Sequence, residues 1–229
     1  MQYRSVKNKI SLVAFLVLWV FTACQTDSYD KGQGELSLTQ AGFVVAHAGS
    51  DKRIDRGQTD EGRTLTVSSP LEAKWITTPD SLYRAIFYYD FVGESETLVA
   101  PKAISAVPTL TPLLPEDYRD GVKTDPVKFE SLWLSANGSY VNMGFYIKVG
   151  QTDSDEARHV VGLVLDRTTV NADRTRTAWL RFYHDQGGVP EYYSSRYYVS
   201  IPTDKIDADS ICLTVHTYEG DVVKRLRVK

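Results

Sequence analysis

The sequence predicts an all-β protein, with a small β-barrel followed by an antiparallel β-sandwich, behind a cleaved export signal. Three observations predict this fold. No segment after the signal shows sustained helical periodicity. Val, Tyr, Thr and Ile recur in period-two runs that Gly, Asn, Asp and Pro interrupt. A proline-dense stretch at residues 108–126 separates two sets of such runs.

The N-terminus has the three parts of an export signal. Three basic residues precede an apolar run at residues 10–21, and the small residues Thr22 and Ala23 follow it. The run is shorter than the roughly 20 apolar residues of a membrane span. Because a cysteine directly after Thr-Ala is typical of bacterial lipoproteins, we expect residues 1–23 to be removed and Cys24 to be lipidated. The alternative is an ordinary secretory signal in which Cys24 is incidental.

Residues 24–34 are predicted to form a lipidated tether, because residues 25–34 contain no aliphatic side chain. Removal of the signal takes three of the 26 basic residues and none of the 29 acidic ones, so the formal net charge changes from −3 to −6. Phosphate contacts supply most of the affinity of nucleic-acid-binding proteins. A chain this acidic is therefore not expected to bind nucleic acid. The partners implied are the membrane, through Cys24, and an envelope protein or glycan.

The C-terminal part contains the clearest strand, at residues 140–149. Its apolar residues alternate with polar ones, which is typical of a half-buried antiparallel strand. Residues 131–135 are its expected partner, and the turn at 136–139 contains Asn137-Gly138, a strong hairpin signal. Further strands are expected at residues 160–165, 177–184, 192–201, 210–217 and 222–228. About seven strands in about 100 residues predict a β-sandwich.

The N-terminal part is less regular. Strands are expected at residues 35–46, 63–68, 82–92 and 97–107, and residues 71–76 form either another strand or a helical turn. Four or five strands in about 75 residues fit a small barrel. The prolines at residues 108–126 predict a semi-stiff linker, and we place the boundary near Leu114. The domains are therefore expected at residues 35–114 and 115–229.

Four motifs in the second half point to a known family: Asp125-Pro126-Val127-Lys128, the turn at Asn137-Gly138, residues 180–185 (Leu-Arg-Phe-Tyr-His-Asp) and Tyr218-Glu219-Gly220-Asp221. With the cysteine-terminated signal, the chain resembles the NigD-like lipoprotein family. The resemblance implies an OB-like N-terminal barrel and a C-terminal β-sandwich. It transfers no mechanism, because none of these motifs is catalytic.

No catalytic residue, metal site or cofactor is predicted. The chain lacks the sequence signatures of nucleophile elbows, zinc proteases and phosphate-binding loops. Residues 47–51 contain His, Ser and Asp, but neighbours in one loop do not make a catalytic triad. Four widely spaced histidines give no ligand pair. His184 is expected to be a hydrogen-bonded structural residue, with a pH-sensitive contact as the alternative.

Cysteine chemistry is also limited. With Cys24 acylated, Cys212 has no disulfide partner and is expected to be a small, partly buried filler. His216 lies four strand residues away, roughly 13 Å, which is too far to activate the thiol. Nearby, Arg225 and Arg227 alternate with apolar residues, which predicts an edge strand protected by charge rather than a phosphate site.

One surface is singled out as a candidate binding face. If residues 177–184 and 192–201 pair as a hairpin across the short loop 185–191, their outward side chains share one face. These side chains are Trp179, Arg181, Tyr183, Tyr192, Arg196 and Tyr198. Aromatic–arginine stacking that stabilises the sheet is one interpretation. A binding face is the other, because Trp, Tyr and Arg are enriched at hot spots.

The function predicted from the sequence is that of a non-enzymatic binding or assembly protein. It would be anchored to the outer membrane through Cys24, on the periplasmic or the cell-surface side. The alternative is a glycan-binding accessory lipoprotein that uses exposed aromatic side chains. Fold alone does not choose between them, since barrels and sandwiches serve many functions.

Overall fold

The computed structural model describes residues 39–229, except residues 153 and 155, and Thr39–Lys229 forms one compact unit. The predicted signal, the lipidation residue Cys24 and the tether lie outside the described residues. The described part is nearly all β, and its only helices are two short 3₁₀ turns. None of its helices has the length and apolar character that a membrane span requires.

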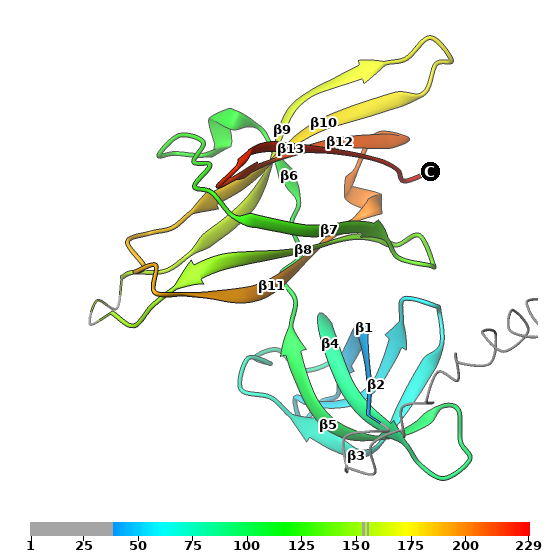
Figure 1. The fold of residues 1–229 in the computed structure, drawn as a ribbon. Coiled ribbons are helices and arrows are strands. Elements are labelled where there is room, and N and C mark those ends of the chain that lie inside the picture. The colour runs from blue at the N-terminus through cyan, green and yellow to red at the C-terminus, as the bar shows by residue number, and fades with distance from the viewer. Residues whose placement is uncertain (1–38, 153, 155) are drawn as a thin grey trace, which may run out of the picture. The chain divides into compact units, whose positions relative to one another are not determined.

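Five strands close into a barrel in the order β1-β2-β3-β5-β4, as Figure 1 shows. Their bounds are β1 Gln40–Ala48, β2 Arg53–Thr59, β3 Thr64–Glu72, β4 Ser81–Phe91 and β5 Leu98–Ala106. Within the barrel, β3 and β5 are the parallel pair. The interior is filled by alternate residues such as Val44, Ala46 and Phe87. The all-β barrel predicted from the sequence is confirmed.

Two details of the barrel differ from the sequence prediction. β2 is absent from the predicted set, because Ile54 is the only large aliphatic side chain in this otherwise polar segment. Ile54, Gly57 and Thr59 are nevertheless buried, with a register shift between Ile54 and Arg56, and they make β2 a barrel strand. Residues 71–76 form neither a separate strand nor a helix: β3 continues to Glu72, and a turn follows, in which Ile76 N–H donates to the Ala73 carbonyl.

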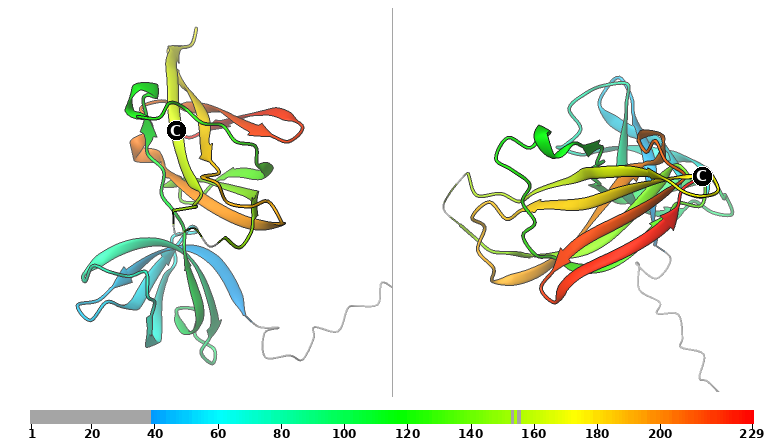
Figure 2. Two further views of the ribbon diagram at one scale, coloured as in Figure 1. Left: turned by 90° about the vertical axis from the view of Figure 1, so that its left-hand side faces the viewer. Right: turned by 90° about the horizontal axis from the view of Figure 1, so that it is seen from above.

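The remaining strands form a sandwich of two sheets, shown from two further sides in Figure 2. One sheet has the order β13-β12-β10-β9-β6 and the other β11-β8-β7. The bounds are β6 Pro112–Leu113, β7 Lys128–Leu134, β8 Tyr140–Val149, β9 Val160–Val170, β10 Arg176–Asp185, β11 Tyr193–Pro202, β12 Ser210–Thr217 and β13 Gly220–Arg227. Two pairs in the larger sheet, β10–β12 and β6–β9, are parallel.

The sandwich core lies between the inner faces of the two sheets. Phe145 of β8 meets Phe182 of β10, with ring centroids 5.1 Å apart, and both are almost fully buried. The β7–β8 hairpin forms as predicted, and Gly138 in its turn has φ +73°, a conformation that glycine adopts without strain. The alternation read from residues 140–149 thus places the apolar side of β8 in this core.

The prediction that residues 108–126 form a linker is wrong. β6 pairs with β9, so the chain enters the sandwich before the boundary predicted near Leu114. Leu110 belongs to the sandwich core, and its N–H donates to the carbonyl of Ser200. Farther along, the Tyr118 ring stacks on Tyr183 at 4.4 Å. The prolines therefore shape a segment that packs along the sandwich, because their fixed φ suits irregular extended chain as well as linkers.

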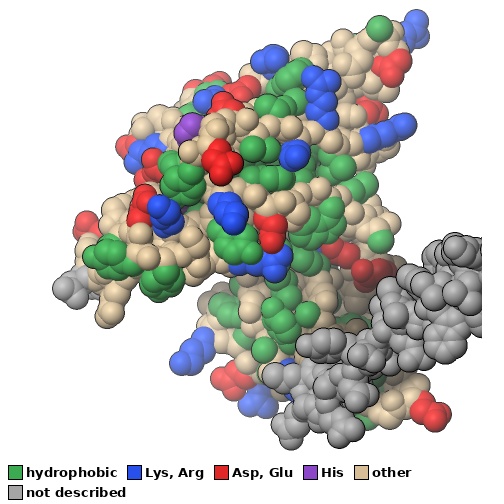
Figure 3. All heavy atoms as spheres, in the orientation of Figure 1, with side chains coloured by type: hydrophobic (Ala, Val, Ile, Leu, Met, Phe, Trp, Pro, Cys, Tyr) green, Lys and Arg blue, Asp and Glu red, His purple; other side chains and the backbone are tan. Residues whose placement is uncertain are grey.

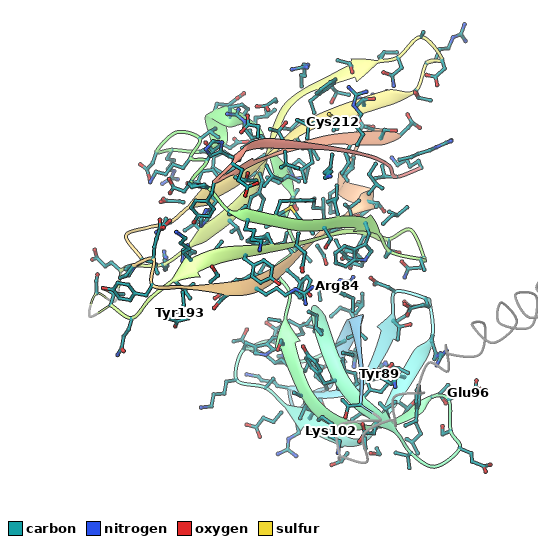
Figure 4. The ribbon with its side chains drawn as sticks, viewed as in Figure 1. Arg84, Tyr89, Glu96, Lys102, Tyr193 and Cys212 are labelled. Atoms are coloured by element: carbon teal, nitrogen blue, oxygen red, sulfur yellow. The ribbon has the colours of Figure 1, made fainter. Side chains whose placement is uncertain are left out.

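The barrel and the smaller sheet meet at a buried polar contact. Arg84 of β4 donates to Ser200 and Asn142 of the sandwich, and Figure 4 shows it beside the three-stranded sheet. Aromatic rings surround it: Phe43 of β1 lies edge-on to Trp133 and Tyr198 at 5.6 and 5.4 Å. At this contact the barrel covers one end of the outer face of the β11-β8-β7 sheet.

Candidate binding site

The six residues of the predicted binding face do not share a face. β10 lies inside the five-stranded sheet, whereas β11 is an edge strand of the other sheet and pairs with β8. The predicted hairpin is therefore wrong, because the chain crosses from one sheet to the other between β10 and β11. Both strands turn their apolar residues toward the common core, so their outward side chains point away from each other.

The β11 half of the predicted set forms a self-contained ladder. Arg196 makes two hydrogen bonds to the Glu130 carboxylate, at 2.7 and 2.8 Å, and lies over the Tyr198 ring at 5.0 Å. This pairing raises the pKa of Arg196 above its ordinary value. Tyr198 packs in turn against Phe43 of the barrel. Stacking that stabilises the sheet explains these residues, while Tyr192 lies exposed just before β11.

Two of the predicted residues on β10 also have side chains that contact other residues of the protein. Tyr183 is only 7% exposed, because Tyr118 from the proline-rich segment stacks on its ring. Arg181 donates to both carboxylate oxygens of Asp166 on the neighbouring strand β9. The Tyr183 ring and the Arg181 guanidinium are therefore both held by neighbouring side chains. The proline-rich segment is what sequence reasoning missed, since a linker would have left Tyr183 uncovered.

Trp179 is different, because arginines without carboxylate partners flank it. Arg167, its cross-strand neighbour on β9, lies 4.3 Å above its ring, and Arg225 of β13 lies 5.6 Å from it. The ring nitrogen donates to the Thr169 hydroxyl at 3.0 Å, which fixes the ring orientation. Cys212 sits between Trp179 and Arg225 in the same row of the sheet and is 1% exposed, more deeply buried than expected.

A groove of about 650 Å³ adjoins Trp179. It lies between the β9–β10 hairpin, which projects beyond its neighbours in Figure 1, and the ends of β12 and β13. Its polar lining comprises Asn171, Asp173, Thr177, Ser210, Arg225 and Arg227. Figure 3 shows Lys and Arg side chains over this part of the sandwich. We call this groove, with Trp179 and Arg167 at its side, the Trp179 groove.

The electrostatics of the Trp179 groove are dominated by arginine. Within residues 39–229 as described, Arg167 and Arg225 form no ion pair at a distance of 4 Å or less, whereas Arg181 and Arg196 each do. One acid, Asp173, lies in the groove. Hydrogen bonds from the Thr175 hydroxyl and N–H hold its pKa below the ordinary range, and Arg227 contributes less. The groove therefore combines exposed guanidinium groups, one ionised carboxylate and several neutral polar side chains.

The structure also brings together two histidines that sequence spacing did not connect. The rings of His159 and His184 stack at 5.2 Å, with Nδ1 of the first 3.0 Å from Nε2 of the second. His184 is 1% exposed, and its Nδ1 donates to the Asp125 carbonyl, as expected of a hydrogen-bonded structural residue. Burial first, and the neighbouring His184 second, lower the pKa of His159. Across the described residues, no three metal-ligating side chains cluster.

The other reactive side chains lie apart. His47 is on β1, where its Nδ1 lies 2.8 Å from the carboxylate of Asp55 rather than near a nucleophile. His216 pairs with Asp221 on the surface, at 2.7 Å. The acidic loop at residues 204–209 uses Asp207 and Asp209 to hold Arg176 through its guanidinium and its N–H. These groups form local structural contacts, and none of them lines the Trp179 groove.

Comparison with known proteins fits this architecture. Residues 109–228 match the family model of the NigD-like C-terminal beta sandwich domain, which is more than half of the chain. The chain belongs to the NigD-like family. The matched region begins next to Leu110 and includes every strand of the sandwich. It also contains all the residues of the Trp179 groove.

Solved structures extend the likeness of this NigD-like chain to the barrel. A NigD-like immunity protein from Bacteroides caccae is 28% identical, covers 82% of this chain and 91% of its own, and has a TM-score of 0.60. A candidate toxin-related protein from Parabacteroides distasonis is 17% identical, with 82% and 92% coverage and a TM-score of 0.63. A candidate lipoprotein from Bacteroides fragilis is 12% identical, with 83% and 98% coverage and a TM-score of 0.60.

The last two likenesses show the fold alone. No protein among the curated ones matches the chain. The family and its neighbours favour a non-enzymatic β-sandwich protein, in line with the function class expected from the sequence.

Proposed function

We propose that this NigD-like chain is a membrane-tethered, non-enzymatic binding protein of the bacterial cell envelope, and that the Trp179 groove is its binding site. The observation that carries the proposal is the arrangement of Arg167 and Arg225 around Trp179 without carboxylate partners in the described residues. Where the same residue types only stabilise a sheet, Glu130 and Asp166 neutralise the arginine.

Physical chemistry supports this distinction. An exposed guanidinium keeps its donors for water or for a ligand, and an aromatic ring that orients it reduces the entropy lost on binding. Trp and Arg are the residue types most enriched among binding hot spots. The tether is supported by the sequence Thr22-Ala23-Cys24, and stable anchoring requires the several acyl chains that such a cysteine carries.

A second candidate is an immunity role. The Bacteroides caccae protein at 28% identity is a NigD-like immunity protein. In such a role this chain would protect the cell that makes it. Deletion of the gene would then sensitise that cell to culture fluid from competing strains, and restored expression would remove the sensitivity.

In-cell photocrosslinking tests the binding site. A photoreactive residue replaces Ala172, which lines the groove, and in a matched control it replaces Tyr146 on the outer face of the other sheet. We expect a crosslinked product from position 172 that is lost when Trp179→Ala is added. Any product from position 146 should be unaffected by Trp179→Ala. Equal products with and without Trp179 in a folded protein would contradict the proposal.

A further inference from the structure

We infer that the Trp179 groove binds the carboxylate groups of an acidic glycan, a polymer of uronic-acid-type sugars. This inference rests on the proposed function and names the ligand class of the same site. It does not follow from the fold, which serves many ligands. It follows from the charges, the hydrogen-bonding groups and the stacking geometry of the groove.

The guanidinium groups define the charge of the ligand. Arg167 and Arg225 approach Trp179 from opposite sides of β10, because β9 and β13 lie on opposite sides of it in the sheet. A guanidinium that lies over an aromatic ring keeps its N–H edges free, and these edges pair with a carboxylate through two parallel hydrogen bonds. Arg227 at the groove is positioned by a hydrogen bond from its Nε to a main-chain oxygen of Lys229.

The same stacking argues against a neutral sugar. Lectin-like aromatic platforms need a free ring face, whereas guanidinium groups occupy the surroundings of Trp179 on both sides. Its ring nitrogen is also engaged, since it donates to Thr169. A ligand therefore meets the arginines before it meets the ring, and recognition is electrostatic rather than apolar.

The neutral and acidic side chains define the rest of the ligand. The Asn171 amide group already donates to the hydroxyls of Thr175 and Thr177, so it offers mainly its oxygen as an acceptor. Ser210 offers a hydroxyl group, and the ionised Asp173 can only accept hydrogen bonds. Such acceptors suit the hydroxyl groups of a sugar. They disfavour a polymer with two or more negative charges on each unit, such as a phosphate monoester or a multiply sulfated sugar, because Asp173 would repel it. A uronic-acid polymer, with one carboxylate and several hydroxyls in each unit, matches this mixture.

An acidic peptide fits less well. Peptide recognition relies on apolar or aromatic pockets for anchor side chains. The apolar groups lining the groove, besides Trp179, are Ala172 and the inward-facing Ile211 and Leu226. Ile211 has no exposed surface, and Leu226 packs against the core. No anchor pocket is therefore present along the described lining, and the occupant we commit to is the glycan.

Calorimetric titration of the purified mature chain in detergent tests the inference. We expect oligomers of polygalacturonate to bind and the same oligomers, after chemical reduction of their carboxylates to alcohols, not to bind. Arg225→Gln should weaken binding at least tenfold, and Arg225→Lys should restore it only in part, because lysine retains the charge without the bidentate geometry. Arg196→Gln, on the other sheet, is the matched control and should bind as the native chain does.

Three results would overturn the inference: no binding of polygalacturonate, equal binding of the reduced oligomers, or equal or tighter binding of polyglutamate. A thermal melt of each variant shows whether it is folded, and Arg167→Gln replaces Arg225→Gln if the latter is not. The outcome is separable from the proposed function. If the crosslink at position 172 depends on Trp179 but polygalacturonate does not bind, the binding site stands and its ligand class is wrong.

Discussion

Arg84 and Asp60 form a buried ion pair at the contact between the barrel and the sandwich. Nη1 lies 2.7 Å from Oδ1, and Nη2 lies 2.8 Å from Oδ2. Both residues belong to the barrel, yet their other partners, Asn142 and Ser200, belong to the sandwich. The Arg84 guanidinium also lies over the Tyr140 ring at 4.1 Å. The hydrogen bonds that the pair makes besides its own contact therefore form only when the two parts are together.

Removal of one charge should destabilise the protein strongly. In Arg84→Met, the carboxylate of Asp60, which is 7% exposed, would remain buried without its cation. Breaking a buried ion pair in this way costs about 3–5 kcal/mol in the free energy of unfolding. Urea denaturation measures this loss.

A surface pair of the same barrel provides the control. Arg53 lies 3.7 Å from Glu72, and both side chains are at least half exposed. Arg53→Met should change the free energy of unfolding by no more than about 1 kcal/mol. A similar loss in both variants would mean that the contact at Arg84 is not specifically stabilising.

The start of the sandwich is tested by two fragments. A fragment that begins at Thr124 lacks β6 and the core residue Leu110. A fragment from Pro108 retains both, including the hydrogen bonds between residues 108–110 and Ser200. We expect the longer fragment to unfold cooperatively. The free energy of unfolding of the shorter fragment should be lower by about 2–5 kcal/mol, the cost of deleting a large buried aliphatic side chain. Equal urea midpoints would show that the proline-rich segment adds nothing.

Local patterns predicted most of the strands. The alternation at residues 140–149 and the Asn137-Gly138 turn are local signals, and both features occur in the structure. Strand β2 is not predicted from the sequence, because Ile54 is the only large aliphatic side chain on its buried side. The packing of the proline-rich segment is not predicted either, because it depends on the contact of Leu110 with a distant strand. Contacts of this kind depend on the arrangement of the sheets, which no short window of sequence contains.

The binding surface shows the same limit. The alternation on β10 correctly predicts which side chains point outward, and Trp179 and Arg181 lie on the outer face. The residues on β11 that the hairpin prediction placed beside them belong to another sheet, since the short loop at residues 185–191 connects two sheets. Arg225 lies in the same row of the sheet, beyond Cys212, and is 46 positions farther along the chain than Trp179. From the sequence it is interpreted only as protection of an edge. β13 is indeed an edge strand, so both roles apply to it.

The anchor prediction concerns Cys24, which lies outside the described residues. Cys24→Ala removes the acylation site, and acyl chains supply about 0.8 kcal/mol of membrane affinity for each buried CH₂ group. The variant is therefore expected in the soluble envelope fraction once its signal is cleaved. As a control, residues 1–24 are replaced by an ordinary secretory signal, which ensures cleavage. If this version still sediments with membranes in high salt, lipidation is not the anchor.

The last prediction is that acid weakens the fold through His159. His184 Nδ1 faces the Asp125 carbonyl, which only accepts, so this nitrogen carries a proton. In neutral rings, His184 Nε2 then accepts from His159 Nδ1, and the buried Nε2 of His159 is left as the site for an added proton. Because the folded pKa of His159 is below its ordinary value, the unfolded chain binds this proton first as the pH falls.

The free energy of unfolding should therefore decrease between about pH 7 and pH 5, since stability rises with pH wherever the unfolded state binds more protons. Carboxylates whose pKa is lowered in the fold, such as Asp185 beside Lys123, act in a separate window near and below pH 4, where the unfolded carboxyl groups titrate. Urea titrations at several pH values should show a smaller slope for His159→Gln than for the native chain between pH 7 and pH 5. His216→Gln, which alters an exposed histidine, is the control and should leave the contribution of His159 in place. An unchanged slope in His159→Gln would show that the stacked pair does not couple protonation to folding.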